Sequence, residues 1–335
     1  MGKSAAKQLI TVLGASGLVG TAVTRELADR PVRLRLVGRR ATAVPRGALA
    51  EIDVRQVDLR EPGAVAAAVD GADVVIHLVA QISGASTWRV AATDPVAERV
   101  NVGLVHDIVE ALRRQRPEKP PLVLLAGSMS QVGRATSARI DGSEPDRPLT
   151  TYDLQKMAAE RAITAADAEG VLRGATLRLA TLYSGGLDAT DLDRGVVSAM
   201  MRRAFAGQPL TMWHDGTVNR DLLCVDDAAR AFVAALDAPE AVTGGSWLIG
   251  TSVATSIAEL FTTISKVVAA TTGDQPVPVL SVPPAEHSVP TDLLDFVVDP
   301  SAFRRATGWV PRVALLDGLD RLATAFARDS APGAD

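Results

Sequence analysis

The chain has 335 residues, of which 47% are hydrophobic and 22% charged, so it can bury the core of one large domain or of two modest ones. Its net charge of −4 and its scattered Lys and Arg side chains argue against a nucleic-acid partner, because a phosphate-binding face needs concentrated positive charge. The single cysteine, Cys224, excludes an intrachain disulfide and a cysteine-built metal site, and it fits a reducing cytoplasm. The four histidines lie far apart, so we predict no metal site.

The same composition argues against a membrane location. No apolar run approaches the roughly 20 residues that a helix needs to cross a bilayer. Residues 1–7 are polar and basic, and they lead into a strand-like run where a signal peptide would have its apolar core. We therefore expect a cytoplasmic protein that does not associate with membranes.

The first half of the chain alternates short apolar runs with longer amphipathic ones. The apolar runs that predict strands cover residues 9–13, 32–37, 54–57, 74–79, 122–125 and, further on, 175–179. The runs that predict helices cover residues 18–29, 62–69, 95–114, 151–169 and 196–206. Continuous apolar strands separated by helices are typical of a parallel sheet covered on both faces. We therefore predict an α/β fold with a doubly wound, Rossmann-type parallel sheet, whose ligands bind at the carboxyl ends of the strands.

The second half is less regular, and its proline-containing stretches at residues 276–284 and at Pro311 predict irregular packing. We expect a smaller lobe to close over the cofactor domain. The predicted division is a cofactor-binding domain over residues 1–180 with 217–240 returning to it, a C-terminal substrate-binding lobe over 181–216 and 241–328, and a disordered tail over 329–335.

A glycine-rich segment joins the first predicted strand to the first predicted helix, with the sequence Gly14-Ala15-Ser16-Gly17-Leu18-Val19-Gly20. Glycine is needed there because the turn is tight and the backbone must approach a pyrophosphate, which rests on the free N–H groups of the helix. The GxxGxxG spacing is a variant associated with short-chain dehydrogenases. We therefore predict that this segment binds a nicotinamide dinucleotide.

The end of the second predicted strand distinguishes between NAD and NADP(H). NAD-binding proteins place an acidic side chain there, which accepts hydrogen bonds from the ribose 2′-hydroxyl. This chain has Gly38-Arg39-Arg40 instead, and two guanidinium groups would pair with a 2′-phosphate. We therefore predict NADP(H) as the cofactor.

Two further segments complete the predicted cofactor site. Asp58 and Leu59 follow the third strand, where an acidic side chain can hydrogen-bond the adenine amino group. Leu78, Val79 and Ala80 end the fourth strand, beside the expected position of the adenosine ribose and the pyrophosphate.

Tyr152 and Lys156 lie four residues apart, so they share one face of a helix. A phenol with a pKa of about 10 is a poor acid–base catalyst near neutral pH. A neighbouring ammonium group, together with the charge of the cofactor, stabilises the phenolate and brings the pKa of the tyrosine toward the working range. The lysine can also hydrogen-bond the nicotinamide ribose. We predict this pair as the proton-handling residues of an oxidoreductase, in contact with the cofactor.

Two polar residues are candidates for the rest of the catalytic set. Ser128 follows the strand at 122–125, where its hydroxyl can bind the carbonyl oxygen of a substrate, and Ser130 is a rival for that role. Asn101 lies in the helix before that strand and could organise a proton relay to Lys156. The predicted catalytic residues are therefore Ser128, Tyr152, Lys156 and Asn101.

Together these positions resemble the extended short-chain dehydrogenase/reductase family, which includes nucleotide-sugar epimerases, dehydratases and reductases. The resemblance covers residues 8–322, and in the second half it is carried by Leu177-Arg178-Leu179, Tyr183, residues 219–227 and residues 307–311. The chain departs from the family at Cys224, which is usually His, and at Ser184, which is usually Gly.

The resemblance also implies a substrate site. In the family, the arginine that matches Arg220 binds the diphosphate of the substrate, and guanidinium suits bidentate phosphate recognition. The segment that matches Leu210-Thr211-Met212-Trp213 lies along the nucleotide base. The predicted substrate-binding residues are Ser128, Met129, Tyr152, Leu210, Met212, Trp213 and Arg220.

A closer resemblance is to the 4-ketoreductases of nucleoside-diphosphate 4-keto-6-deoxyhexoses in antibiotic deoxysugar pathways. It is carried by residues 8–11, 31–35, 86–89, 98–104 and 209–216. It implies a dTDP-4-keto-6-deoxyhexose as substrate. In the family, the helices that match residues 95–114 and 151–169 often form a four-helix bundle between two subunits, which implies a homodimer.

Three alternatives to ketoreduction are open to such a chain. A 4,6-dehydratase carries an acidic pair just after the catalytic hydroxyl, whereas Ser128 is followed by Met129-Ser130-Gln131. A 4-epimerase returns its hydride to the same substrate and typically holds NAD permanently, whereas Arg39-Arg40 favours exchangeable NADPH and net reduction. A non-catalytic NADP-binding regulator would keep the glycine segment and lose the catalytic residues, which this chain retains. We therefore expect reduction at C4, with the proton from Tyr152, and keep the epimerase as the first alternative.

Overall fold

The computed structural model describes residues 7–82, 90–91, 94–135, 137, 139–186, 193–284 and 290–330. Within them, seven parallel strands form one sheet in the order β11-β6-β5-β4-β1-β2-β3. Their bounds are β1 Leu9–Leu13, β2 Arg33–Gly38, β3 Glu51–Gln56, β4 Val74–His77, β5 Leu122–Ser128, β6 Arg173–Leu179 and β11 Ser246–Ile249. The strand order reverses between β1 and β4, where a doubly wound sheet binds its ligand. The predicted Rossmann-type fold is confirmed.

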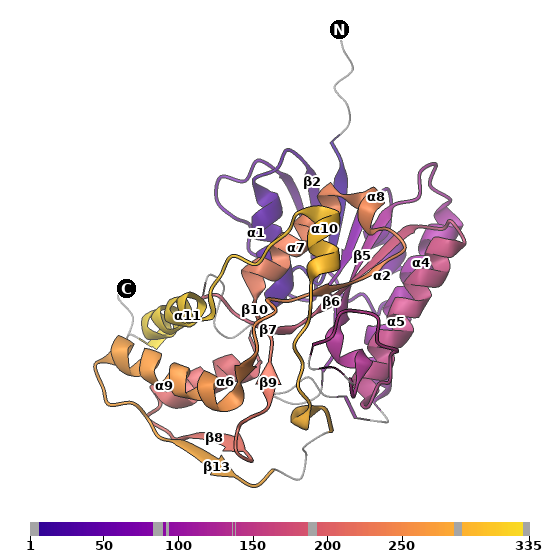
Figure 1. Ribbon diagram of the computed structural model, residues 1–335. Coiled ribbons are helices and arrows are strands. Elements are labelled where there is room, and N and C mark those ends of the chain that lie inside the picture. The colour runs from indigo at the N-terminus through magenta and orange to yellow at the C-terminus, as the bar shows by residue number, and fades with distance from the viewer. Residues whose placement is uncertain are drawn as a thin grey trace.

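Helices cover both faces of this sheet (Figure 1). One layer contains α1 (Leu18–Ala28), α7 (Val225–Asp237), α8 (Pro239–Val242) and α10 (Ser301–Thr307), and the other contains α2 (Ala64–Val69), α4 (Leu104–Gln115) and α5 (Thr151–Ala168). Each layer has its own buried apolar cluster. In β1, Ile10 and Val12 belong to the cluster of the first layer, whereas Leu13 belongs to that of the second. This division follows from the alternation of side chains along a strand.

The edge of the sheet differs from the prediction. We expected a strand over residues 54–57 with both faces covered, but β3 begins at Glu51 and most of its side chains are exposed or only partly buried. The reason is its place in the sheet, since β3 has a neighbour on one side only. The next predicted helix begins at Ala64 and not at Pro62, because Gly63 takes a left-handed conformation with φ 77° and ends the turn before it.

The helix predicted over residues 95–114 contains an irregular segment. It consists of α3 (Pro95–Glu98), a π-helical stretch η1 (Arg99–Gly103) and α4. Asp94 caps its start by accepting hydrogen bonds from the N–H groups of Val96 and Ala97. A π-helical stretch inside a helix often marks a functional position, and this one contains Asn101.

A smaller lobe has an apolar core of its own (Figure 1). It is built from α6 (Val196–Phe205), α9 (Ile257–Thr272), α11 (Leu315–Ser330) and the parallel pair β8 (Leu210–Trp213) and β13 (Val279–Val282). Residues 276–284 add no strand to the main sheet, and within them β13 pairs with β8 alone. Helix α11 includes residues 329 and 330 of the predicted tail, and residues 331–335 lie outside the described part.

The boundary predicted at residue 241 is also wrong. Strand β11 pairs with β6 and so belongs to the main sheet. Phe303 of α10 and Trp309 lie in the apolar cluster of the first helical layer. These segments belong to the domain of the seven-stranded sheet, because their apolar side chains pack in the same helical layer as α7.

Short strand pairs join the two parts. Strand β7 (Thr181–Tyr183) pairs with β10 (Leu222–Cys224), and β9 (Asn219–Arg220) pairs with β12 (Thr255–Ser256). In the described part of the chain, no helix is long and apolar enough to cross a membrane. No group of three or more His, Cys, Asp or Glu side chains among those residues could hold a metal ion.

Candidate active site

The glycine segment forms a tight turn between β1 and α1. Gly14 has φ +89°, and a Cβ atom at Gly20 would lie 2.1 Å from the carbonyl oxygen of Gly14, so no larger residue fits there. Gly17 occupies the cap position of α1 and has no side chain, so it provides no hydrogen bond to the first N–H groups of the helix, at Leu18 and Val19. A turn of this kind, at a helix N-terminus, fits a pyrophosphate.

The two arginines lie directly beside this turn. Arg40 donates a hydrogen bond of 2.9 Å from Nη2 to the carbonyl oxygen of Ser16. A Cβ atom at Gly38 would lie 2.7 Å from the Ser16 Oγ, so the end of β2 touches the glycine segment. Arg39 and Arg40 are both exposed. Their position therefore fits a phosphate group on the adenosine ribose of a dinucleotide.

The remaining predicted cofactor residues lie around the same edge of the sheet. Arg60 donates to the carboxylate of Asp58 at 2.6 Å and lowers the pKa of that carboxyl to about 2. Asp58 can thus hydrogen-bond the adenine amino group only while its carboxylate also accepts from Arg60. Leu59 is buried, and the backbone of Leu78 and Val79 comes within 3.1 Å of a Cβ atom placed on Gly14. Ala80 is half-buried.

The structure brings Ser128, Tyr152 and Lys156 together. Ser128 ends β5, and α5, which packs on β5, carries the other two. Ser128 and Tyr152 share a side-chain hydrogen bond. The Lys156 ammonium donates to the carbonyl oxygen of Ala126 at 2.9 Å and lies 5.7 Å from the centre of the Tyr152 ring. The three side chains thus form one polar group at the carboxyl end of β5.

Burial determines the protonation of this group. It raises the pKa of Tyr152 above its usual value, the charge of Asp153 raises it further, and the hydrogen bond with Ser128 opposes both. Burial also lowers the pKa of Lys156 to about 8. That Lys156 and the charge of a bound cofactor together bring the phenol toward neutral pH stays a prediction.

Asn101 forms hydrogen bonds with Gln81 and Gln155, whereas the predicted proton relay leads to Lys156. Its side-chain amide donates to the carbonyl oxygen of Gln81 at 2.9 Å and to the Gln155 side chain at 2.7 Å, and its oxygen accepts from the N–H of Gln81 at 2.7 Å. None of these three bonds involves Lys156. Asn101 therefore holds the segment after β4 against α5. Its contact on α5 is Gln155, the residue before Lys156.

Sequence reasoning missed a chain of polar contacts behind Ser128. The Ser128 and Ser130 hydroxyl oxygens lie 2.7 Å apart, and Ser130 donates to Oδ1 of Asp153 at 2.5 Å. Thr150 donates to Oδ2 of Asp153 at 2.7 Å and accepts from its backbone N–H. The Thr-x-x-Asp spacing indicates a helix cap in the sequence, but nothing in it showed that the same carboxylate reaches Ser130.

The predicted substrate residues are only partly exposed to a ligand. The Met129 and Leu210 side chains are buried in apolar clusters, so the prediction that they contact substrate is wrong for the side chains. Met212 and Trp213 are half-buried on β8. The guanidinium of Arg220 donates to the carbonyl oxygens of Thr291, Asp292, Leu294 and Asn219. Residues 86–89 lie outside the described part.

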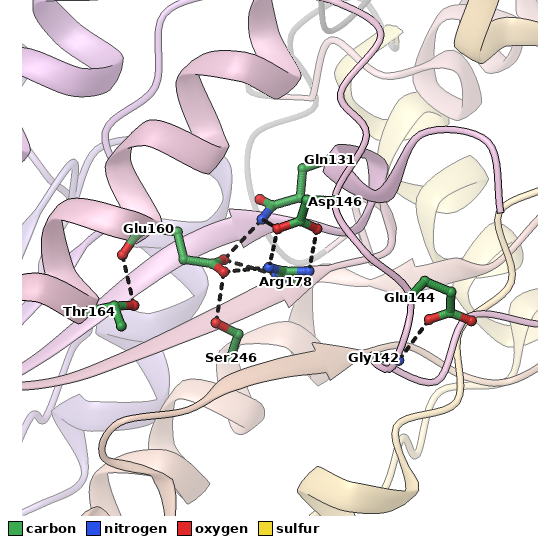
Figure 2. Close-up of polar contacts among 8 residues, drawn as sticks. All are labelled: Gln131, Gly142, Glu144, Asp146, Glu160, Thr164, Arg178 and Ser246. Atoms are coloured by element: carbon green, nitrogen blue, oxygen red, sulfur yellow. Dashed lines mark hydrogen bonds and ion pairs between the residues drawn. The ribbon is translucent and has the colours of Figure 1, made fainter.

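A buried ionic cluster lies between the elements that carry Ser128 and Tyr152 (Figure 2). Arg178 of β6 donates to both carboxylate oxygens of Asp146, at 2.9 and 2.8 Å, and to Glu160 of α5. The side-chain amide of Gln131 donates to the same two carboxylates, at 3.1 and 3.3 Å. Gln131 lies in η2 (Met129–Val132), directly after Ser128. Arg178 therefore joins the element that follows Ser128 to the helix that carries Tyr152.

Comparison with known proteins assigns the family. Residues 10–250 match the model of the NAD dependent epimerase/dehydratase family. The chain belongs to that family. This agrees with the resemblance to extended short-chain dehydrogenases/reductases drawn from the sequence.

Individual relatives of the chain have different activities. A UDP-glucose 4-epimerase of Mycolicibacterium smegmatis is 29% identical over 77% of this chain and 77% of its own length. A dTDP-6-deoxy-L-talose 4-dehydrogenase (NAD(P)(+)) of Kitasatospora kifunensis is 27% identical over 94% of this chain and 95% of its own. The structure of MoeE5 in complex with UDP-glucose and NAD is 25% identical, with a TM-score of 0.78 over 96% of this chain and 99% of that one.

Proposed function

We propose that this protein is an NADPH-dependent reductase of the C4 ketone of a dTDP-4-keto-6-deoxyhexose. The observation that carries the proposal is the grouping of Ser128, Tyr152 and Lys156 at the carboxyl end of β5, with the Lys156 ammonium 5.7 Å from the centre of the buried Tyr152 ring. A protonated phenol beside a second hydroxyl is the arrangement that a ketone needs to become an alcohol. The nucleotide-sugar relatives support the substrate class, and the 4-dehydrogenase supports chemistry at C4.

The residues of the chain have separate roles in this reaction. Tyr152 donates its phenolic proton to the carbonyl oxygen as negative charge develops there, and Ser128 helps to hold that oxygen. Lys156 remains charged below a pH of about 8, so its ammonium group stabilises the phenolate that is left behind. Gly14, Gly17 and Gly20 would hold the pyrophosphate of NADPH, with Arg39 and Arg40 at the 2′-phosphate. When bound, NADPH supplies the hydride that reduces C4.

Arg39 and Arg40 give a direct test of the cofactor. We expect the double variant Arg39→Ala/Arg40→Ala to bind NADPH roughly 100-fold more weakly, because it loses two charged hydrogen-bond donors to the 2′-phosphate. NADH has no such phosphate, so its affinity should change little. Titration calorimetry with both cofactors measures this. The control is Arg33→Ala, at the opposite end of β2. Equal weakening of both cofactors would contradict the assignment.

A 4-epimerase is the second candidate, because the UDP-glucose 4-epimerase resembles the chain over most of its length. An epimerase returns the hydride to its own substrate and consumes no NADPH, and a non-catalytic regulator turns over nothing. The separating experiment supplies several 4-keto sugars with NADPH and identifies the product by NMR. Stoichiometric NADPH oxidation with a new C4 alcohol supports the reductase. Interconversion without oxidation supports the epimerase, and binding without turnover removes the substrate assignment.

We also propose that the chain forms a homodimer through the outer surface of α4 and α5. A groove of about 790 Å³ lies between these helices and is lined by side chains that include Val102, His106, Met157 and Ala158. Leu154, also in its lining, is 50% exposed. A second copy of the same helices would cover this face, as the family resemblance implies.

The charged variant Leu154→Glu tests the dimer. It should convert the dimer to a monomer in light scattering coupled to size exclusion, because a carboxylate at the interface would be desolvated. The matched control is Leu316→Glu, since this leucine is 54% exposed and belongs to α11 of the smaller lobe. A native protein that is monomeric, or a Leu154→Glu variant that stays dimeric, would contradict the proposal.

A further inference from the structure

A buried carboxylate stands directly behind the catalytic pair. Asp153 follows Tyr152 on α5, is 1% exposed, and forms no ion pair with any residue in the described part of the chain. Its two oxygens accept from two hydroxyls, those of Ser130 and Thr150. Both bonds favour the carboxylate form of Asp153, against burial, which raises its pKa.

The hydroxyl hydrogens set the direction of the hydrogen bonds that join Asp153, Ser130 and Ser128. A serine hydroxyl has a single hydrogen. Ser130 gives its hydrogen to Asp153, so it can only accept from Ser128, whose oxygen lies 2.7 Å away. Ser128 has then used its own hydrogen, so of these three hydroxyls only that of Tyr152 is left to donate toward a substrate.

The charged groups around the phenol come from few elements. On α5 they are Asp153 and Lys156, and Lys156 lies 5.7 Å from the ring centre. From β4, His77 is buried near Lys156, and burial lowers the pKa of His77 to about 3, so it is neutral. From β6, Arg178 pairs with two carboxylates, those of Asp146 and Glu160. The negative charge that raises the pKa of Tyr152 is that of Asp153, the next residue on α5.

We propose that Asp153 is a positioning residue of the active site, which directs the hydrogens of Ser130 and Ser128 away from the substrate and so makes Tyr152 the proton donor. This proposal rests on the proposed ketoreduction for its consequence. Tyr152 can give its proton to the carbonyl oxygen without breaking the bonds between Asp153, Ser130 and Ser128. Ser128 must turn its hydrogen away from Ser130 before it can help to hold that oxygen. The carboxylate also opposes the phenolate, which keeps Tyr152 in its acid form over a wide pH range.

The test uses the fact that the chain has only two tyrosines, Tyr152 and Tyr183. Labelling tyrosine with ¹³C at Cζ gives two NMR signals, which Tyr152→Phe assigns, and each signal moves when its phenol ionises. In Asp153→Asn the Tyr152 signal should begin to move at a pH lower by on the order of one unit than in the native protein. With substrate, the alkaline decline of the reduction rate should shift in the same direction.

Two further variants keep the proposal falsifiable. Thr150→Val removes the cap bond to Asp153 but keeps the charge, so both pH profiles should stay in place. A shift equal to that of Asp153→Asn would overturn the proposal, as would an unshifted Asp153→Asn. If Asp153→Asn does not fold, Ser130→Ala cuts the chain of contacts and keeps the charge, and its kcat should fall roughly tenfold, the worth of one hydrogen bond. An unchanged kcat would overturn the proposal.

The NMR titration needs neither substrate nor cofactor. A shifted titration in a protein that reduces no 4-keto sugar would remove the proposed function and leave the role of Asp153 in place. An unshifted titration in an active reductase would do the reverse.

Discussion

Replacing Tyr152 by Phe is expected to lower kcat for ketone reduction by roughly 10² to 10⁴, the usual contribution of a positioned general acid. The variant loses only the hydroxyl that bonds to Ser128, and its ring can keep the position beside Lys156. KM should change less than kcat, because the proton is transferred in the transition state and not on binding. Steady-state kinetics with NADPH and the 4-keto sugar measures both quantities.

The other tyrosine provides a matched control. Tyr183 is fully buried in the smaller lobe, and its hydroxyl has no hydrogen-bond partner among the described residues. Tyr183→Phe therefore removes the same atom from a place where it makes no polar contact, and kcat should stay close to the native value. If the two variants lose activity equally, or if Tyr152→Phe keeps it, the acid role of Tyr152 is contradicted.

Replacing Arg178 by Met is expected to lower the free energy of unfolding by about 3–5 kcal/mol, because it leaves the carboxylates of Asp146 and Glu160 buried without a cation. The side chains of Arg178 and Glu160 are 10% and 8% exposed, so water can compensate little of the loss. Kinetic effects are expected as well, since the same cluster fixes Gln131 after Ser128 and Glu160 on the helix of Tyr152 (Figure 2). Urea unfolding followed by tryptophan fluorescence measures the change.

The same strand carries the control for this variant. Arg173 of β6 pairs at 3.4 Å with Glu240, which is 82% exposed, so Arg173→Met should cost about 1 kcal/mol or less. Adding Glu160→Gln to Arg178→Met should recover part of the loss, because it removes one of the two unpaired charges. An Arg178→Met variant that is no less stable than Arg173→Met would contradict the role given to the cluster.

The sheet could be predicted well because its signals are local. The strands at residues 9–13 and 122–125 are continuous apolar runs, and the glycine segment after the first strand marks the start of the first helix. Strand β11 was missed because Ser246–Ile249 is short and its place beside β6 depends on contacts across the whole chain. The π-helical stretch around Asn101 was missed because it keeps the apolar pattern of an ordinary helix.

The site was predictable where the residue types and their spacing in the sequence point to the same role, as for Tyr152 and Lys156. It was not predictable where side chains meet only in the fold. Asp153 lies next to Tyr152 in the sequence, yet its effect depends on Ser130 of another element. Arg220 has a suitable guanidinium for a diphosphate, but whether its donors are available depends on carbonyl groups about seventy residues further along the chain.

The destination of the cofactor's hydride tests the central claim most directly. The protein is supplied with a dTDP-4-keto-6-deoxyhexose and with NADPH that carries deuterium at the transferred position, and the sugar product is examined by NMR. We predict one deuterium at C4 of a new alcohol for each NADPH oxidised, and none with Tyr152→Phe over the same time. A product without deuterium, or sugars that interconvert while NADPH stays unchanged, would contradict ketoreduction.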